Sequence, residues 1–145
     1  MVNATMAKFG FPATLVAEFA HWVVLVRPAQ VTLGSLVLAS THDVTAYGEL
    51  PADAFTEQGV AVAAIERMLT AFTAYERINY LMLMMVDRQV HFHVIPRYSG
   101  PREWGGRSFP DTGWPGPPAL GTAVTLEGKE LKSLGNALKS VQSSN

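Results

Sequence analysis

The sequence predicts an α+β domain with an antiparallel sheet of about five strands, one long helix between strands and a C-terminal helix. Three observations support this prediction. Short runs of β-branched and aromatic residues recur along the chain, a helical apolar pattern follows residue 53, and a second one follows residue 125. The length of 145 residues suits a single domain, with a core over about residues 10–98.

The first half of the chain holds three predicted strands and the long helix. The strands are expected at residues 15–19, 21–26 and 36–38, where Val, Leu and aromatic residues dominate. Pro51 and Asp53 suit a first helical turn, because proline needs no N–H partner there and a carboxylate complements the helix dipole. The helix should run from Asp53 to about Ala74, with an apolar stripe of Phe55, Val62, Ile65, Leu69 and Phe72.

The second half begins with a predicted hairpin. A strand at 78–86 should return through a tight turn at Asp87-Arg88 into a strand at 89–95, which Pro96 ends. Residues 98–121 are rich in proline and glycine but also hold aromatic residues, so we expect an ordered loop. Thr125 should cap a helix over about 125–140.

Composition narrows the function classes. A net charge of −1 gives no support for binding a nucleic acid polymer or a membrane. The longest apolar run, residues 80–86, is far too short to span a bilayer, and the first eight residues lack the apolar stretch of a signal peptide. The chain has no cysteine, which excludes disulfides and cysteine-bound zinc. We therefore expect a cytoplasmic protein.

The most informative segment is Gln89-Val-His91-Phe-His93-Val-Ile-Pro-Arg97. Alternate residues of a strand share a face, so Gln89, His91 and His93 should point one way and the apolar residues between them into the core. Three interpretations fit the two histidines. They are a hydrogen-bonded pair without chemistry, a metal site, or a site of nucleophilic catalysis.

The segment resembles the motif of the histidine triad superfamily, in which three histidines alternate with apolar residues and Pro-Arg often follows. Gln89 stands where the first histidine would be, so the motif is a variant, Gln-x-His-x-His. Gly34-Ser35 is similar to the Gly-His step of that family, and Leu50-Pro51-Ala52-Asp53 to the start of its helix. The resemblance implies a histidine-triad fold, with the motif strand at the centre of the sheet.

The resemblance also implies a function, a nucleotide hydrolase or nucleotidyl transferase. His91 would attack phosphorus and form a covalent nucleotidyl-histidine, while His93 and Gln89 would donate hydrogen bonds to the phosphoryl oxygens. Arg27 and Ser35 replace substrate-contacting residues of the family. Arg97, with other arginines and aromatic residues near it, is a further candidate for anion binding.

No cofactor or metal is implied, and the expected partner is a nucleotide-like small molecule. Relatives in this family are often homodimers, so a homodimer is expected here. Two alternatives remain open. One is a binding module of the same fold that has lost the chemistry, and the other is a metal-dependent enzyme with His91 and His93 as ligands.

Overall fold

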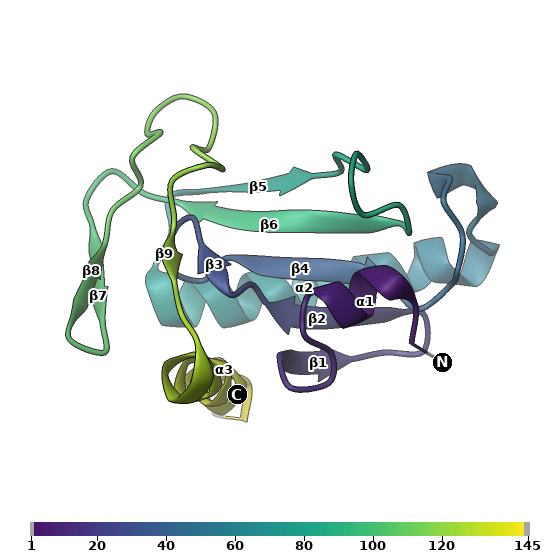
Figure 1. Cartoon of the computed structure of the whole chain (residues 1–145), viewed down its shortest axis with the longest axis horizontal. Coiled ribbons are helices and arrows are strands. Elements are labelled where there is room, and N and C mark those ends of the chain that lie inside the picture. The colour runs from purple at the N-terminus through teal and green to yellow at the C-terminus, as the bar shows by residue number, and fades with distance from the viewer. Residues whose placement is uncertain (1, 144–145) are drawn as a thin grey trace.

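The computed structural model describes residues 2–143 and is built around a five-stranded antiparallel sheet (Figure 1). The strand order is β1-β2-β4-β6-β5. The strands are β1 (Leu15–Glu18), β2 (Trp22–Val26), β4 (Leu36–Ser40), β5 (Arg77–Leu81) and β6 (His91–Arg97). The predicted α+β class and sheet are confirmed. The central strand is β4, so the expectation that the motif strand lies at the centre is wrong by one position.

Helices cover both faces of the sheet (Figure 1). The long helix α2 (Ala52–Thr73) and the C-terminal helix α3 (Gly128–Ser143) share one core with the sheet, and the short helix α1 (Ala4–Lys8) packs on the opposite face. A short 3-10 helix, η1 (Tyr47–Glu49), precedes α2. No helix within residues 2–143 combines the length and apolarity needed to cross a membrane.

The apolar stripe predicted for α2 is correct in its middle and wrong at its start. Ile65 and Leu69 are fully buried, as a stripe at helical spacing requires. Phe55 is instead 39% exposed and packs against the ring of Tyr47, with 5.2 Å between ring centroids. The buried position in that first turn is taken by Ala54, whose carbonyl accepts a hydrogen bond from the indole of Trp22 at 2.7 Å.

The predicted pairing of the two strands is present, but the prediction of a tight turn between them is wrong. Strand β5 ends at Leu81 and β6 begins at His91, so residues 82–90 form a nine-residue connection in place of a tight turn at Asp87-Arg88. Met84 in this connection has a φ of +56°, a left-handed conformation that a strand cannot continue through. Gln89 therefore precedes the motif strand, and the strand continues through Pro96 to Arg97.

Two small sheets complete the fold. Strand β3 (Ala29–Gln30) pairs with β9 (Val124–Thr125), and β7 (Arg102–Trp104) pairs with β8 (Arg107–Phe109). Thr125 thus belongs to a strand and does not cap the last helix. That helix begins at Gly128, and it buries Leu134 and Leu138. The last two residues, 144 and 145, lie outside the described part of the chain.

Candidate active site

The two motif histidines lie side by side on the face of β6 that α1 covers. Because β6 pairs with β4 in antiparallel register, His91 lies opposite Ala39 and His93 opposite Val37. Val94 points into the core on the other face, as strand alternation predicts. The two imidazole rings are perpendicular, with 5.2 Å between their centroids, so both can contact one small group.

One ring nitrogen of His91 already has a hydrogen-bond partner within the chain. Its Nδ1 lies 2.7 Å from the backbone carbonyl oxygen of Gln89. A carbonyl can only accept, so the hydrogen of the neutral ring belongs on Nδ1 and the lone pair on Nε2. The backbone around Gln89 thereby selects the tautomer in which Nε2 is the nucleophilic atom.

His93 is held neutral by its surroundings. Burial lowers the pKa of His93 to about 4, and the nearby charges of Arg27 and His91 act in the same direction. Its Nδ1 is buried and has no hydrogen-bond partner in the described chain. Near pH 7 this imidazole can therefore donate one hydrogen bond but does not serve as a cation.

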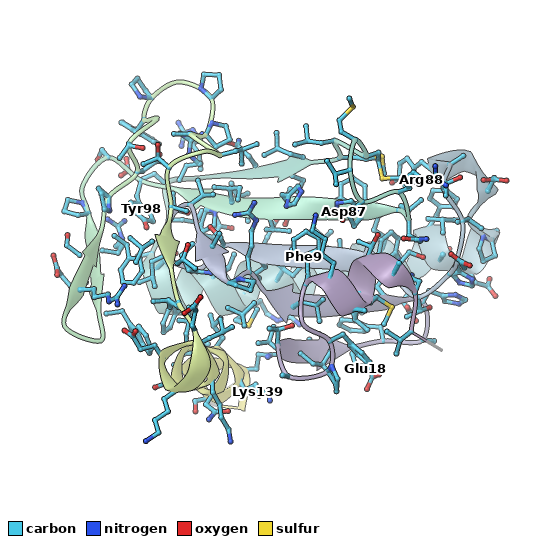
Figure 2. The ribbon with its side chains drawn as sticks, viewed as in Figure 1. Phe9, Glu18, Asp87, Arg88, Tyr98 and Lys139 are labelled. Atoms are coloured by element: carbon cyan, nitrogen blue, oxygen red, sulfur yellow. The ribbon has the colours of Figure 1, made fainter. Side chains whose placement is uncertain are left out.

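A cavity of about 290 Å³ adjoins both histidines. One part of its wall is polar and carries charges of both signs, and the other is apolar and comes from Leu83, Met84, Met85 and Val86. Phe9 and Asp87, both marked in Figure 2, contribute to the lining. The lining residues are Lys8, Phe9, Arg27, Leu83, Met84, Met85, Val86, Asp87, His91 and His93.

Helix α1 brings two residues to this cavity that the sequence reasoning missed. The Phe9 ring lies 5.8 Å from that of His91 and 5.7 Å from that of His93, measured between centroids. Lys8 forms an ion pair with Asp87 at 2.9 Å. The available signal was Asn3, a good N-cap whose side chain accepts from the Met6 N–H at 2.9 Å. Five residues are too few for an apolar periodicity to show.

Arg27 also lines this cavity. Its Nη1 donates to the carbonyl of Ala29 at 2.6 Å, while its Nε is buried without a partner in the described residues. Burial lowers the pKa of Arg27, but an arginine remains charged near pH 7. The buried side-chain atoms found without partners in residues 2–143 belong to Arg27 and His93, which line the same cavity. Arg27 thereby brings a positive charge to the wall of the cavity that holds both histidines.

The Gln89 side chain turns away from the histidine cavity. Its Oε1 accepts from the hydroxyl of Thr5 at 2.6 Å and from the Thr5 N–H at 3.2 Å. Its Nε2 donates to Asp43 at 3.0 Å. The amide is thus engaged in holding α1 to the loop after β4, and only the backbone of Gln89 touches His91.

Ser35 and Arg97 are not brought to the histidines either. The Ser35 hydroxyl is fully buried in a turn, where it bonds the backbone of Thr32. Arg97 lines a separate cavity of about 540 Å³ and forms an ion pair with Asp111 at 2.7 Å. Its remaining hydrogen bonds go to Asn79 and to the carbonyl of Gly116. Both side chains already have partners within the chain.

The side chains of residues 2–143 include no group of three or more His, Cys, Asp or Glu placed to hold a metal ion. His91 and His93 would therefore need a third ligand from outside this part of the chain. A zinc site in proteins normally uses three or four protein ligands.

Comparison with known proteins gives a clear answer for the fold. No protein-family model and no curated protein sequence matches the chain. Three solved structures illustrate the likeness. A histidine triad protein from Sinorhizobium meliloti has a TM-score of 0.73 at 20% identity, covering 97% of this chain and 95% of its own. A histidine triad protein from Bradyrhizobium japonicum has a TM-score of 0.71 at 17% identity, and the match covers 97% of this chain and 96% of that protein's chain.

The third structure is an enzyme by its description. It is the Plasmodium falciparum diadenosine triphosphate hydrolase in complex with cyclomarin A, with a TM-score of 0.67 at 10% identity, covering 92% of this chain and 79% of its own. These likenesses cover 92–97% of this chain. The chain has the fold of the histidine triad superfamily.

Proposed function

We propose that this protein is a histidine triad hydrolase or nucleotidyl transferase that acts at the phosphorus centre of a nucleotide-like substrate. The single observation that carries the proposal is the contact between His91 Nδ1 and the Gln89 carbonyl. It leaves Nε2 of His91 as a nucleophile beside a cavity with an arginine and a second imidazole. The diadenosine triphosphate hydrolase that shares the fold supports the substrate class.

The reaction would proceed in two displacements. The lone pair on Nε2 forms a bond to phosphorus while the bond to the leaving group breaks, and the leaving group takes a proton from solvent. Water then attacks the nucleotidyl-His91, the phosphorus–nitrogen bond breaks, and a proton returns to solvent. In a transferase another hydroxyl or amine replaces this water. Splitting one hard displacement into two easier ones is the catalytic gain.

The neighbouring groups would stabilise charge at phosphorus. Neutral His93 donates one hydrogen bond to a non-bridging oxygen, and Arg27 supplies a fixed positive charge and an unused N–H. Gln89 enters the proposal through its carbonyl, because its amide is occupied by Thr5 and Asp43. These steps use only groups of the chain itself and water.

The test is turnover of adenosine 5′-phosphoramidate and of diadenosine triphosphate by the wild type, His91→Ala and a control, His42→Ala. His42 lies in another imidazole pair, with His21. We expect His91→Ala to lower kcat at least about a thousandfold, since removal of a nucleophile removes the covalent route. His42→Ala should stay near wild type. Mass spectrometry of rapidly quenched wild type should show one nucleotidyl group on His91. Unchanged turnover in His91→Ala would reject this role.

One observation favours a binding module as the second candidate. His91 is only 2% exposed and His93 8%, with Phe9 against both rings. A site so covered in its resting state could bind a nucleotide without completing the reaction. Calorimetry with AMP, combined with product analysis, separates the two candidates. Binding without any product from either substrate would favour the module.

A further inference from the structure

The connection between β5 and β6 exposes an unusual concentration of large apolar side chains. Met85 is 82% exposed, Val86 78% and Leu83 47%. Three of the seven exposed large hydrophobic residues in the described chain thus lie within four consecutive positions. Exposed apolar side chains are common singly, but a cluster indicates a contact.

This apolar cluster belongs to the histidine cavity. Leu83, Met85 and Val86 line the same cavity as His91 and His93. The ion pair between Lys8 and Asp87 ties the end of the connection to α1, which holds the cluster at the cavity rim. The cluster is therefore placed where part of a bound substrate would lie.

Another part of the wall is polar. Arg27 supplies a positive charge there, whereas Lys8 is paired with Asp87. An anionic group fits this side, because the guanidinium of Arg27 would attract it. The cavity is consequently amphipathic within about 290 Å³.

We propose that the substrate of this site is a phosphoryl compound with an apolar substituent, an alkyl or aromatic group that lies against Leu83, Met85 and Val86. The inference rests on the proposed function and narrows its substrate class. The phosphoryl group occupies the polar wall beside His91, and the substituent covers the apolar rim. Burying each methylene there removes apolar surface from water on both sides of the contact.

The experiment measures binding of n-alkyl phosphates, from ethyl to hexyl phosphate, to the full chain by calorimetry. For the wild type we expect Kd to fall roughly two- to fourfold for each added methylene. In the double variant Met85→Ser/Val86→Ser this dependence on chain length should be lost. The matched control is Val60→Ser, an exposed valine on α2 outside the cavity lining, which should behave as wild type.

The outcomes separate this inference from the proposed function. Turnover of adenosine 5′-phosphoramidate with no dependence on alkyl length would overturn the inference and leave the enzyme intact. A clear dependence on alkyl length without turnover of any phosphoramidate would support the amphipathic site and count against the enzyme. A flat series, together with a smaller light-scattering mass for the loop double variant, would assign the cluster to a contact between two copies and overturn the inference.

Discussion

At the scale of single residues, the site depends on which atoms are already bonded. The backbone carbonyl of Gln89 accepts a hydrogen bond from Nδ1 of His91. The side-chain amide of Gln89 is hydrogen-bonded to Thr5 and Asp43. One residue therefore orients the candidate nucleophile through its backbone and anchors α1 through its side chain. This accounts for a glutamine at the first motif position without requiring it to contact substrate.

The low pKa of His93 predicts how the stability of the protein changes with pH. Its pKa is about 4 in the folded protein, below the ordinary value of 6.5, because burial disfavours the charged ring. Between these two values the unfolded chain binds more protons, so stability is lost as pH falls from about 6.5 to 4. The loss attributable to His93 is at most about 3 kcal/mol.

Urea unfolding at pH 7.5 and pH 4.5 measures this effect. The wild type should lose more stability on acidification than His93→Asn, which has no proton to gain at this position. The comparison between the two proteins cancels the contributions of the other histidines. An equal loss in both would show that His93 titrates normally and that the cavity is better hydrated than its burial indicates.

At the scale of elements, α1 and the 82–90 connection together cover the histidines. Helix α1 is held by Asn3, which donates to the carbonyls of Ser40 and His42, and by Gln89. Phe9 then lies over both imidazoles just after the helix ends. Access to His91 should accordingly depend on this covering, which consists of a short helix and a loop.

The variant Phe9→Ala tests that dependence. Removing the ring should increase the rate at which diethyl pyrocarbonate modifies His91 by several fold, because the imidazole is almost inaccessible under Phe9 in the resting structure. Site-resolved mass spectrometry gives the rate for each histidine. The control Phe55→Ala, a half-exposed ring packed on Tyr47, should leave the His91 rate unchanged. An unaltered rate in Phe9→Ala would mean that access is controlled elsewhere.

The segment after β6 depends on a buried ion pair. The side chains of Arg97 and Asp111 are 4% and 1% exposed, and the carboxylate accepts two hydrogen bonds from the guanidinium. Asp111→Ala would leave the guanidinium buried without its counter-ion, so we expect a loss of about 3 kcal/mol or more in urea unfolding.

A surface pair provides the matched control. Arg107 and Glu130 are 3.1 Å apart, and both side chains are more than 40% exposed. Glu130→Ala should change stability little, because solvent screens exposed pairs. Limited proteolysis should also cut Asp111→Ala faster within residues 98–121. Equal stability of the two variants would contradict a structural role for Arg97 and would reopen its assignment to substrate.

At the scale of the whole molecule, strand β5 and a groove on α2 are the surfaces where we expect a second chain to bind. Strand β5 is an edge strand, with β6 as its neighbour on one side. A groove on α2, lined by Ala63, Glu66, Arg67, Thr70, Ala71 and Tyr75, adds a hollowed surface. Unpaired strand edges favour pairing with another chain. The homodimer that the family resemblance implies stays a prediction, and we propose this edge and this groove as its interface.

Light scattering at micromolar concentration tests the dimer. We expect a mass of two chains for the wild type, and a shift toward one chain for Ala71→Arg, which places a bulky charge in the α2 groove. Ser133→Arg, an exposed position on α3 outside the groove, is the control and should remain dimeric. A single-chain mass for the wild type would contradict the prediction.

The sequence alone determined the features that depend on local geometry. The side chains of a strand alternate wherever it lies, so the common face of His91 and His93 followed from their spacing. The apolar repeat likewise placed α2 to within a residue or two at each end. The variant motif indicated the histidine triad fold that the structural comparisons support.

Only the tertiary structure decided which side chains meet. Thr5 and Gln89 are 84 positions apart, and Arg27 reaches the histidines from another strand end, so no local pattern could show either contact. The apolar run after β5 predicted a strand, yet it forms an exposed loop because its partner strand begins only at His91. Pairing and burial depend on residues distant in sequence, and they set both the covering of the site and its amphipathic wall.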